Sequence, residues 1–424
     1  EALLLREEAV RQVPCSHEIA AYFMGDRLDD TWQEQQRHAQ GVFSIMVLLL
    51  DELVGAGPGD KRHRLSDYFG DLRARWSRNA RARFPPFFAS HVRAELEGTT
   101  ALDIFDEGEL GIAREYELLG SLCPDVAARH SLEAYRRVWT LVNSRVLNQA
   151  AGASSVRDEA MAQSALLPVF DLANHWLPPP EAPLTTEDQI QAHLARSRGR
   201  YGVRSASAQL AGASSQLQLW SNEALTEGEE ITDVYGIKAN EDFLWSFGFT
   251  IPWIHNSTCL ASTRLRVAVA SLPKASARRS LPSAATGALH FRVDSCLGQG
   301  FEELLAFARY WHADASDDVL RDHCGLVRPG RSSGGWQLAE RCQHVSPRSE
   351  LAALRLINKS VLAKASRLAG GSLEEDENLL ARLRPSARRD AVTVRRDEKS
   401  VLSRLVEWLH GQASSLALAG SGEL

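Results

Sequence analysis

Residues 228–236 read Gly-Glu-Glu-Ile-Thr-Asp-Val-Tyr-Gly, and residues 239–249 follow as Ala-Asn-Glu-Asp-Phe-Leu-Trp-Ser-Phe-Gly-Phe. The first of these segments predicts a short β-strand that ends near Tyr235. A third segment, Asp-Leu-Ala-Asn-His at residues 171–175, ends a short apolar extended run. Taken singly, an Asn-His pair after a strand is typical of a turn, and a Tyr at a strand end is often a core residue. The three segments therefore gain meaning only together.

The composition sets the class of protein. The chain has 424 residues, of which 44% are hydrophobic and 24% are charged, as in a soluble protein with room for two domains. A net charge of −6 argues against a nucleic-acid surface, which normally carries a basic excess. The longest apolar run, residues 42–50, is about half of what a bilayer span needs. We expect neither a nucleic acid nor a membrane as partner.

The cysteines and the first residue give information about the cellular compartment of the protein. The six cysteines form no Cys-x-x-Cys pair, so we expect no structural zinc or other metal. In a chain of this length they predict reduced, mostly buried thiols and an intracellular protein. The sequence opens on Glu1 rather than Met, so we expect a preceding segment that carries any targeting signal. Cytoplasm, nucleus and plastid all remain open.

The apolar pattern divides the chain into three parts. Residues 1 to about 147 are predominantly helical in pattern, with one buried face running through residues 43–53. Short extended segments dominate from about residue 165 to residue 255. Helices return afterwards, and we predict them at Glu302–His312, Glu350–Leu368, Leu373–Leu383 and Arg389–His410.

The order and spacing of the three quoted segments resemble the SET domain. The resemblance is to the subgroup that includes the RuBisCO large-subunit lysine methyltransferase and the actin histidine methyltransferase. Asn-Ser-Arg at residues 143–145 and the segment 87–102 look like the inserted helical subdomain of that family. Residues 374–402 resemble its C-terminal substrate-binding domain. Each motif is weak alone, but the ordered set spans nearly the whole chain.

The resemblance implies an α+β fold in which small β-sheets are knotted together and carry a helical insertion. Residues 1–255 would form the SET domain, with the insertion at about residues 20–160. Residues 256–424 would form an all-α substrate-binding domain of ordinary size. The family's first strands, with a Gly-x-Gly turn, would precede Glu1.

The resemblance also assigns site residues. Tyr235 would place its hydroxyl at the point of methyl transfer and would be the catalytic residue. Asn174 and His175 would hold S-adenosylmethionine, largely through backbone groups. Arg145 would donate to the cofactor's carboxylate, where a fork-shaped cation is well suited, or it would be an ordinary solvated helix charge.

Two further residues are assigned to the substrate. Asp171 would contact the substrate or simply cap the strand end. Phe247 stands where the lysine enzymes usually carry a second Tyr, so it would shape the substrate channel or merely pack beneath it. The position four residues after Arg145 is Gln149, where the lysine enzymes can carry another Arg.

The function that follows is methyl transfer from S-adenosylmethionine to a lysine of a non-histone protein. The C-terminal helical domain would dock that protein substrate, and the enzyme would act as a monomer. Methylation of a protein histidine is an alternative on the same scaffold. A non-catalytic protein-binding module that kept the fold is an alternative of another class.

Overall fold

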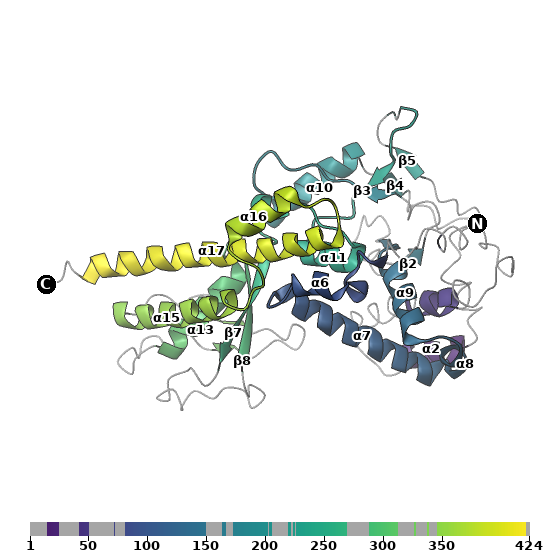
Figure 1. The fold of residues 1–424 in the computed structure, drawn as a ribbon, viewed down its shortest axis with the longest axis horizontal. Coiled ribbons are helices and arrows are strands. Elements are labelled where there is room, and N and C mark those ends of the chain that lie inside the picture. The colour runs from purple at the N-terminus through teal and green to yellow at the C-terminus, as the bar shows by residue number, and fades with distance from the viewer. Residues whose placement is uncertain are drawn as a thin grey trace.

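The structure is a computed structural model, and it describes about two thirds of the chain. The described residues are 15–24, 42–50, 72, 81–149, 163–166, 173–201, 203–205, 219–221, 224, 226–268, 288–312, 326–327, 337–338 and 346–420. Figure 1 shows a helical region at the N-terminal end, small sheets above it, and a second helical region that extends to the C-terminus.

Most of the N-terminal helical region packs on one apolar core. It contains buried residues of the helical segment 42–49, of α7 and of α9. Thr99 and Ser131 cap the two longer helices, each accepting a hydrogen bond from a backbone N–H of the first turn. The elements of this region are α2 (Ser16–Met24), η3 (Pro85–Phe87), α6 (Ser90–Ala94), α7 (Thr100–Leu122), α8 (Pro124–Arg129) and α9 (Leu132–Asn143).

The middle of the chain carries short strands that pair two by two. The antiparallel pairs are β1 (Val146–Gln149) with β2 (Gln163–Leu166) and β4 (Val203–Ser205) with β5 (Leu219–Ser221). The remaining pair, β3 (Asn174–His175) with β6 (Thr232–Asp233), is parallel. The helices between and after them are α10 (Glu187–Tyr201), α11 (Asn240–Phe247) and α12 (Ile254–Ser257).

The C-terminal part contains a β-hairpin, so the prediction of an all-α domain over residues 256–424 is wrong. Strands β7 (Ser262–Ala268) and β8 (Ala288–Asp294) pair antiparallel over their full length. Thr263, Leu265 and Val267 are buried while Arg264 and Arg266 are not, which is the two-residue period of a strand. This strand was not among the elements predicted from the sequence. The short strands β9 (Leu326–Val327) and β10 (Gln337–Leu338) also pair.

The four predicted C-terminal helices are confirmed with shifted ends. They are α13 (Gln299–His312), α15 (Pro347–Ala365), α16 (Leu373–Arg382) and α17 (Ala387–Gly420). A capping box between Ser372 and Glu375 begins α16. Apolar residues of β7, β8, α13, α15 and α17 share one core. Within the described residues no helix is long and apolar enough to cross a membrane.

The first half of α17 is buried on every side. All ten residues from Asp390 to Lys399 are buried, although six of them are ionisable. In Figure 1 this half of the helix lies close to α16, α6 and α11. A helix with one exposed face would leave every third or fourth residue in water, so α17 is here enclosed by both helical regions.

Arg395 shows how these charges are satisfied. Its guanidinium donates to both carboxylate oxygens of Asp376 on α16, at 3.0 and 2.5 Å. It also donates to the carboxylate and the carbonyl of Glu95, which follows α6, at 2.5 and 3.1 Å. Lys399 Nζ reaches Asp376 at 2.7 Å. The cluster thereby joins the C-terminal helices to the N-terminal helical region.

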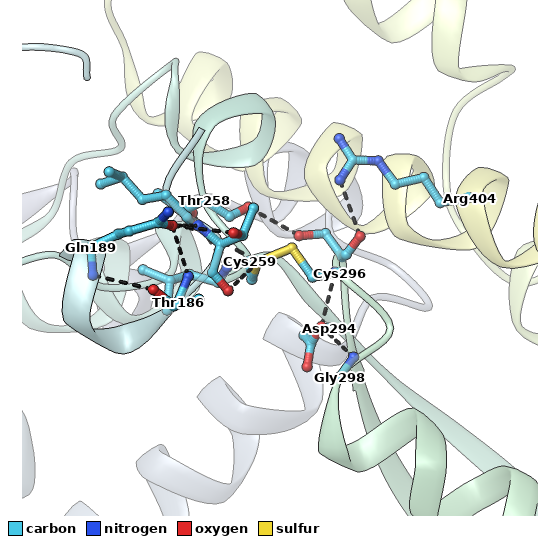
Figure 2. The surroundings of a disulfide bond; sticks show 12 residues. Thr186, Gln189, Thr258, Cys259, Asp294, Cys296, Gly298 and Arg404 are labelled. Carbon is cyan, nitrogen blue, oxygen red and sulfur yellow. Dashed lines mark hydrogen bonds between the residues drawn. A yellow bond between two sulfur atoms is a disulfide. The ribbon is translucent and has the colours of Figure 1, made fainter. Parts of the chain in front are cut away.

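Four cysteines are paired, which contradicts the expectation of reduced thiols. Cys15 bonds to Cys123, and Cys259 bonds to Cys296. Figure 2 shows the second disulfide at the base of the β7–β8 hairpin, where Arg404 of α17 donates to the Ser295 carbonyl at 3.1 Å. The partners lie 108 and 37 residues apart in the chain, so local spacing gave no sign of them. The compartment itself stays a prediction.

Removing the buried Arg395 should destabilise the protein far more than removing an exposed arginine of the same cluster. Arg395→Ala leaves the Asp376 and Glu95 carboxylates with fewer partners inside the protein, which should cost about 3–5 kcal/mol. Arg388→Ala removes an ion pair from the same Glu95 at an exposed position and should cost about 0–1 kcal/mol. Chemical denaturation of both variants measures the difference. Equal losses would contradict the structural role given to Arg395.

Candidate functional site

Two of the three segments singled out in the sequence lie side by side. Asn174 pairs with Thr232 and His175 pairs with Asp233 in the parallel β3–β6 ladder. The Trp176 N–H continues the ladder by donating to the Asp233 carbonyl at 3.0 Å. Residues nearly 60 positions apart in the sequence are therefore fixed in register, and the end of this ladder is where His175 and Tyr235 meet.

His175 is held as a neutral imidazole with a defined tautomer. Its Nδ1 accepts a hydrogen bond from the Tyr235 backbone N–H at 2.9 Å, so the ring proton lies on Nε2. Burial lowers the pKa of His175 to about 4. Among the described residues Nε2 has no hydrogen-bond partner although it is buried. A buried donor without a partner is costly, so this N–H requires an acceptor beyond the described residues.

The Tyr235 hydroxyl is oriented by the segment next to His175. It donates to the Ala173 carbonyl, one residue before the β3 strand. The Tyr235 ring lies 5.2 Å from the His175 ring and 4.9 Å from the Phe247 ring, measured between centroids. Tyr235 therefore bonds to the segment 173–175 twice, through its backbone N–H to His175 and through its hydroxyl to Ala173.

The other wall of the site comes from α11. Phe243 and Phe249 lie 5.3 and 5.6 Å from the His175 ring, and Phe243 is completely buried. The helix ends at Gly248, whose φ of 73° turns the chain in a conformation that favours glycine. This turn brings Phe247 and Phe249 onto the same aromatic cluster. The cluster is defined by His175, Tyr235, Phe243, Phe247 and Phe249, and is called the aromatic site below.

The start of α11 is anchored by Asn240. Its side chain amide accepts from the Ile251 N–H at 2.7 Å and donates to the Ile251 carbonyl at 3.1 Å. The same amide donates to Asp397 of α17 at 2.6 Å. The helix that carries Phe243 and Phe247 is therefore fixed to the buried half of α17.

The predicted site residues are only partly brought together. Tyr235, His175 and Phe247 meet in the aromatic site. Asn174 is adjacent but exposed, and its side chain donates to Glu230. Arg145 lies in the turn between α9 and β1, where its N–H donates to Val142 at 3.0 Å, and its part in a cofactor site stays a prediction. Asp171 lies outside the described residues.

Sequence reasoning missed three contributors to the site. The Ala173 carbonyl, Phe243 and Phe249 were not assigned a role, yet each contacts Tyr235 or His175. Gly248 between Phe247 and Phe249 could have indicated that both rings lie on one cluster, because a glycine after a helix predicts such a turn. Within the described ranges, no group of three or more His, Cys, Asp or Glu side chains is placed to hold a metal.

Comparison with known proteins identifies the fold. Residues 277–402 match the family model described as Rubisco LSMT substrate-binding. The structure of Rubisco LSMT bound to AdoMet aligns with 88% of this chain and 76% of its own, at a TM-score of 0.58 and 14% identity. The chain has the fold of the SET-domain Rubisco methyltransferases. The SET domain of LSMT bound to lysine and AdoHcy aligns with 89% of this chain and 76% of its own, at a TM-score of 0.59 and 14% identity.

A third solved structure agrees with these two. Rubisco LSMT bound to sinefungin and monomethyllysine covers 88% of this chain and 76% of its own, at a TM-score of 0.56 and 16% identity. No curated protein matches the sequence. The resemblance inferred from the three segments is thus confirmed as a resemblance of fold and of the C-terminal domain, including α15, α16 and the buried half of α17.

We expect His175 to stay neutral down to unusually low pH. Its folded pKa of about 4 lies below the ordinary histidine value of about 6.5, so the unfolded chain takes up a proton first. The stability it contributes is therefore complete above about pH 6.5 and is lost as the pH falls towards 4. NMR of the labelled imidazole should show the Nε2–H tautomer at pH 7. Titration near 6.5, or a proton on Nδ1, would contradict the assigned site.

Proposed function

We propose that this protein transfers a methyl group from S-adenosylmethionine to a lysine of another, non-histone protein. The observation that carries the proposal is the pairing of His175 with the Tyr235 backbone while the Tyr235 hydroxyl is held by Ala173. Solved structures with a similar fold are bound to AdoMet, or to lysine and AdoHcy, which supports the proposal. The aromatic site would then be the place where the methyl group is transferred.

The residues around the ladder fit such a cofactor. The buried His175 Nε2–H is a donor that lacks an acceptor among the described residues. Asn174 precedes it on β3 and is exposed. Arg145, from its place in the sequence pattern, would add a cation for the cofactor's carboxylate. When bound, S-adenosylmethionine would supply a methyl group activated by a positively charged sulfur.

The chain's own residues would make the nitrogen acceptor reactive. A lysine amine normally has a pKa near 10.4, and it must lose a proton before it can attack. Apolar rings exclude water and disfavour the ammonium form, and Phe243, Phe247 and Phe249 provide such walls. The Tyr235 hydroxyl is oriented by its hydrogen bond to Ala173, and its oxygen would make weak C–H···O contacts to the methyl group. Positioning rather than covalent chemistry is the main contribution.

The proposed substrate is a folded protein docked by the C-terminal domain. The match of residues 277–402 to a substrate-binding family supports this role. We propose an intracellular enzyme that acts as a monomer. Its division at about residue 255, with a helical insertion before it, is part of the same proposal. Most of the insertion and most of the C-terminal part have apolar cores of their own, and a third cluster joins α6, α7 and α11 to α17.

The two alternatives differ in measurable ways. Histidine methylation is favoured by one observation, namely that Phe247 rather than a tyrosine contacts Tyr235. Mass spectrometry of methylated peptides separates lysine from histidine products. A non-catalytic binding module would bind a protein partner without binding S-adenosylmethionine, so calorimetric titration with the cofactor separates it from an enzyme.

Removing the Tyr235 hydroxyl should impair transfer without unfolding the protein. Tyr235→Phe keeps the ring contacts, so the melting temperature should change little, while transfer of radiolabelled methyl groups to lysate proteins should fall by about 10²-fold or more. Tyr116→Phe is the matched control, because the Tyr116 hydroxyl also donates to a carbonyl, that of His130, outside the site. A fully active Tyr235→Phe protein would assign Tyr235 to the core instead.

If lysine is the target, Phe247 should favour a trimethylated product. In lysine enzymes of the SET family, tyrosine hydroxyls near the amine hold a water that blocks further methylation, and Phe247 lacks that hydroxyl. Phe247→Tyr should shift the product towards mono- and dimethyl forms, roughly five- to tenfold for one hydrogen bond. Intact-mass measurement of the methylated substrate gives the distribution. An unchanged distribution would leave Phe247 as a packing residue.

A further inference from the structure

A basic pocket lies away from the aromatic site, between the start of α7, the β7–β8 hairpin and α15. Its volume is about 340 Å³, within the range of pockets that bind ligands. Strand β7 contributes Arg264 and Arg266, and β8 contributes His290. The side of α15 and the turn after it contribute Lys359, Ser360, Ala363, Lys364 and Arg367.

The fold explains why these cations share one surface. On β7, Arg264 and Arg266 point away from the core because Leu265 and Val267 point into it. His290 is the partner of Arg266 across the hairpin. Lys359 and Ala363 are four residues apart on one face of α15, and Arg367 follows in the turn after the helix. Gly98 also lines the pocket and lets the chain pass close to Arg367, because a side chain there would collide with the Arg367 carbonyl.

Some of these charges are already compensated, and others are not. Lys364 lies 3.1 Å from the buried Glu398, and Arg264 lies 3.0 Å from the exposed Glu107. Asp103 is the carboxylate among the lining residues. Within the described part of the chain no ion pair neutralises Arg266, Lys359 or Arg367. The pKa of His290 is lowered by burial and by Arg264 and Arg266, so this ring adds no charge near neutral pH.

The spacing of the cations favours several separate anionic groups over one. Lys359 lies six residues before the end of α15, which is roughly 9 Å along the axis, and Arg367 follows in the turn after the helix. Arg264 and Arg266 are two residues apart on a strand, or roughly 6.6 Å. Alternate side chains of an extended peptide repeat at this same interval of roughly 6.6 Å. A row of carboxylates on an extended segment can therefore meet several of the cations at once.

We propose that the basic pocket binds an acidic, extended segment of the protein substrate through its carboxylates. The inference rests on the proposed function, since it assigns the docking role to named residues. Arginine binds carboxylates in a two-pronged geometry, which suits Arg266 and Arg367. A nucleic acid is disfavoured, because it needs a long basic surface and the chain carries a net charge of −6.

The binding test uses a fluorescein-labelled peptide of alternating Glu and Gly, with the same peptide in Gln form as a neutral probe. We expect the parent protein to bind the Glu peptide more tightly than the Gln peptide, and more weakly as salt is added. The double variant Arg266→Gln with Lys359→Gln should lose about tenfold in affinity. Arg384→Gln, an exposed cation in the turn after α16 and outside the pocket, should bind as the parent does.

Each outcome decides a separate claim. No preference for the Glu peptide, equal binding by the double variant, or binding of inorganic phosphate or an oligonucleotide in its place would overturn the inference. In the transfer assay, the double variant should raise KM for protein substrate while cofactor binding stays unchanged. A parent protein that binds the acidic peptide but not S-adenosylmethionine would support the pocket and overturn the proposed function.

Discussion

The structure depends on a helix that is buried together with its charges. Between Asp390 and Lys399, α17 has no exposed face. An ionisable side chain there that lacked a partner would lose its hydration free energy without compensation. The partners come from every part of the chain that surrounds it. Arg395 pairs with Glu95 and Asp376. Asp397 interacts with Asn240 and Arg396. Glu398 interacts with Thr100, Thr263 and Lys364. These bonds fix the relative position of the two helical regions.

Asn240 connects the aromatic site to this helix. Asn240 holds the start of α11 on Asp397, and the same amide fixes Ile251 just beyond the end of that helix. The helix therefore has little freedom to move, and Phe243, Phe247 and Phe249 are presented to His175 and Tyr235 from a rigid support. A site built in this way can hold the neutral His175 ring and the Tyr235 hydroxyl in place before any ligand arrives.

The sequence predicted the residues of the site better than the surroundings that hold them. Tyr235, His175 and Phe247 could be found because their segments keep a recognisable order, and the parallel pairing of Asn174 and His175 with β6 brings them together. The buried charges of α17 could not be found, because Arg395-Arg396-Asp397-Glu398-Lys399 has the composition of a solvated helix face. Its burial depends on partners elsewhere in the chain, some of them hundreds of residues away, such as Glu95 and Thr100. The β7–β8 hairpin was predictable from its two-residue period, whereas the cysteine pairs depend on long-range contacts.

The most direct test of the central claim is a crystal structure of the protein grown with saturating S-adenosylmethionine. The account expects the cofactor at the end of the β3–β6 ladder, with an acceptor atom within hydrogen-bond distance of His175 Nε2 and its methyl group directed towards the Tyr235 hydroxyl. A cofactor bound elsewhere, or a protein that takes up none while His175 and Tyr235 keep their present contacts, would contradict the assignment of the aromatic site as the place of methyl transfer.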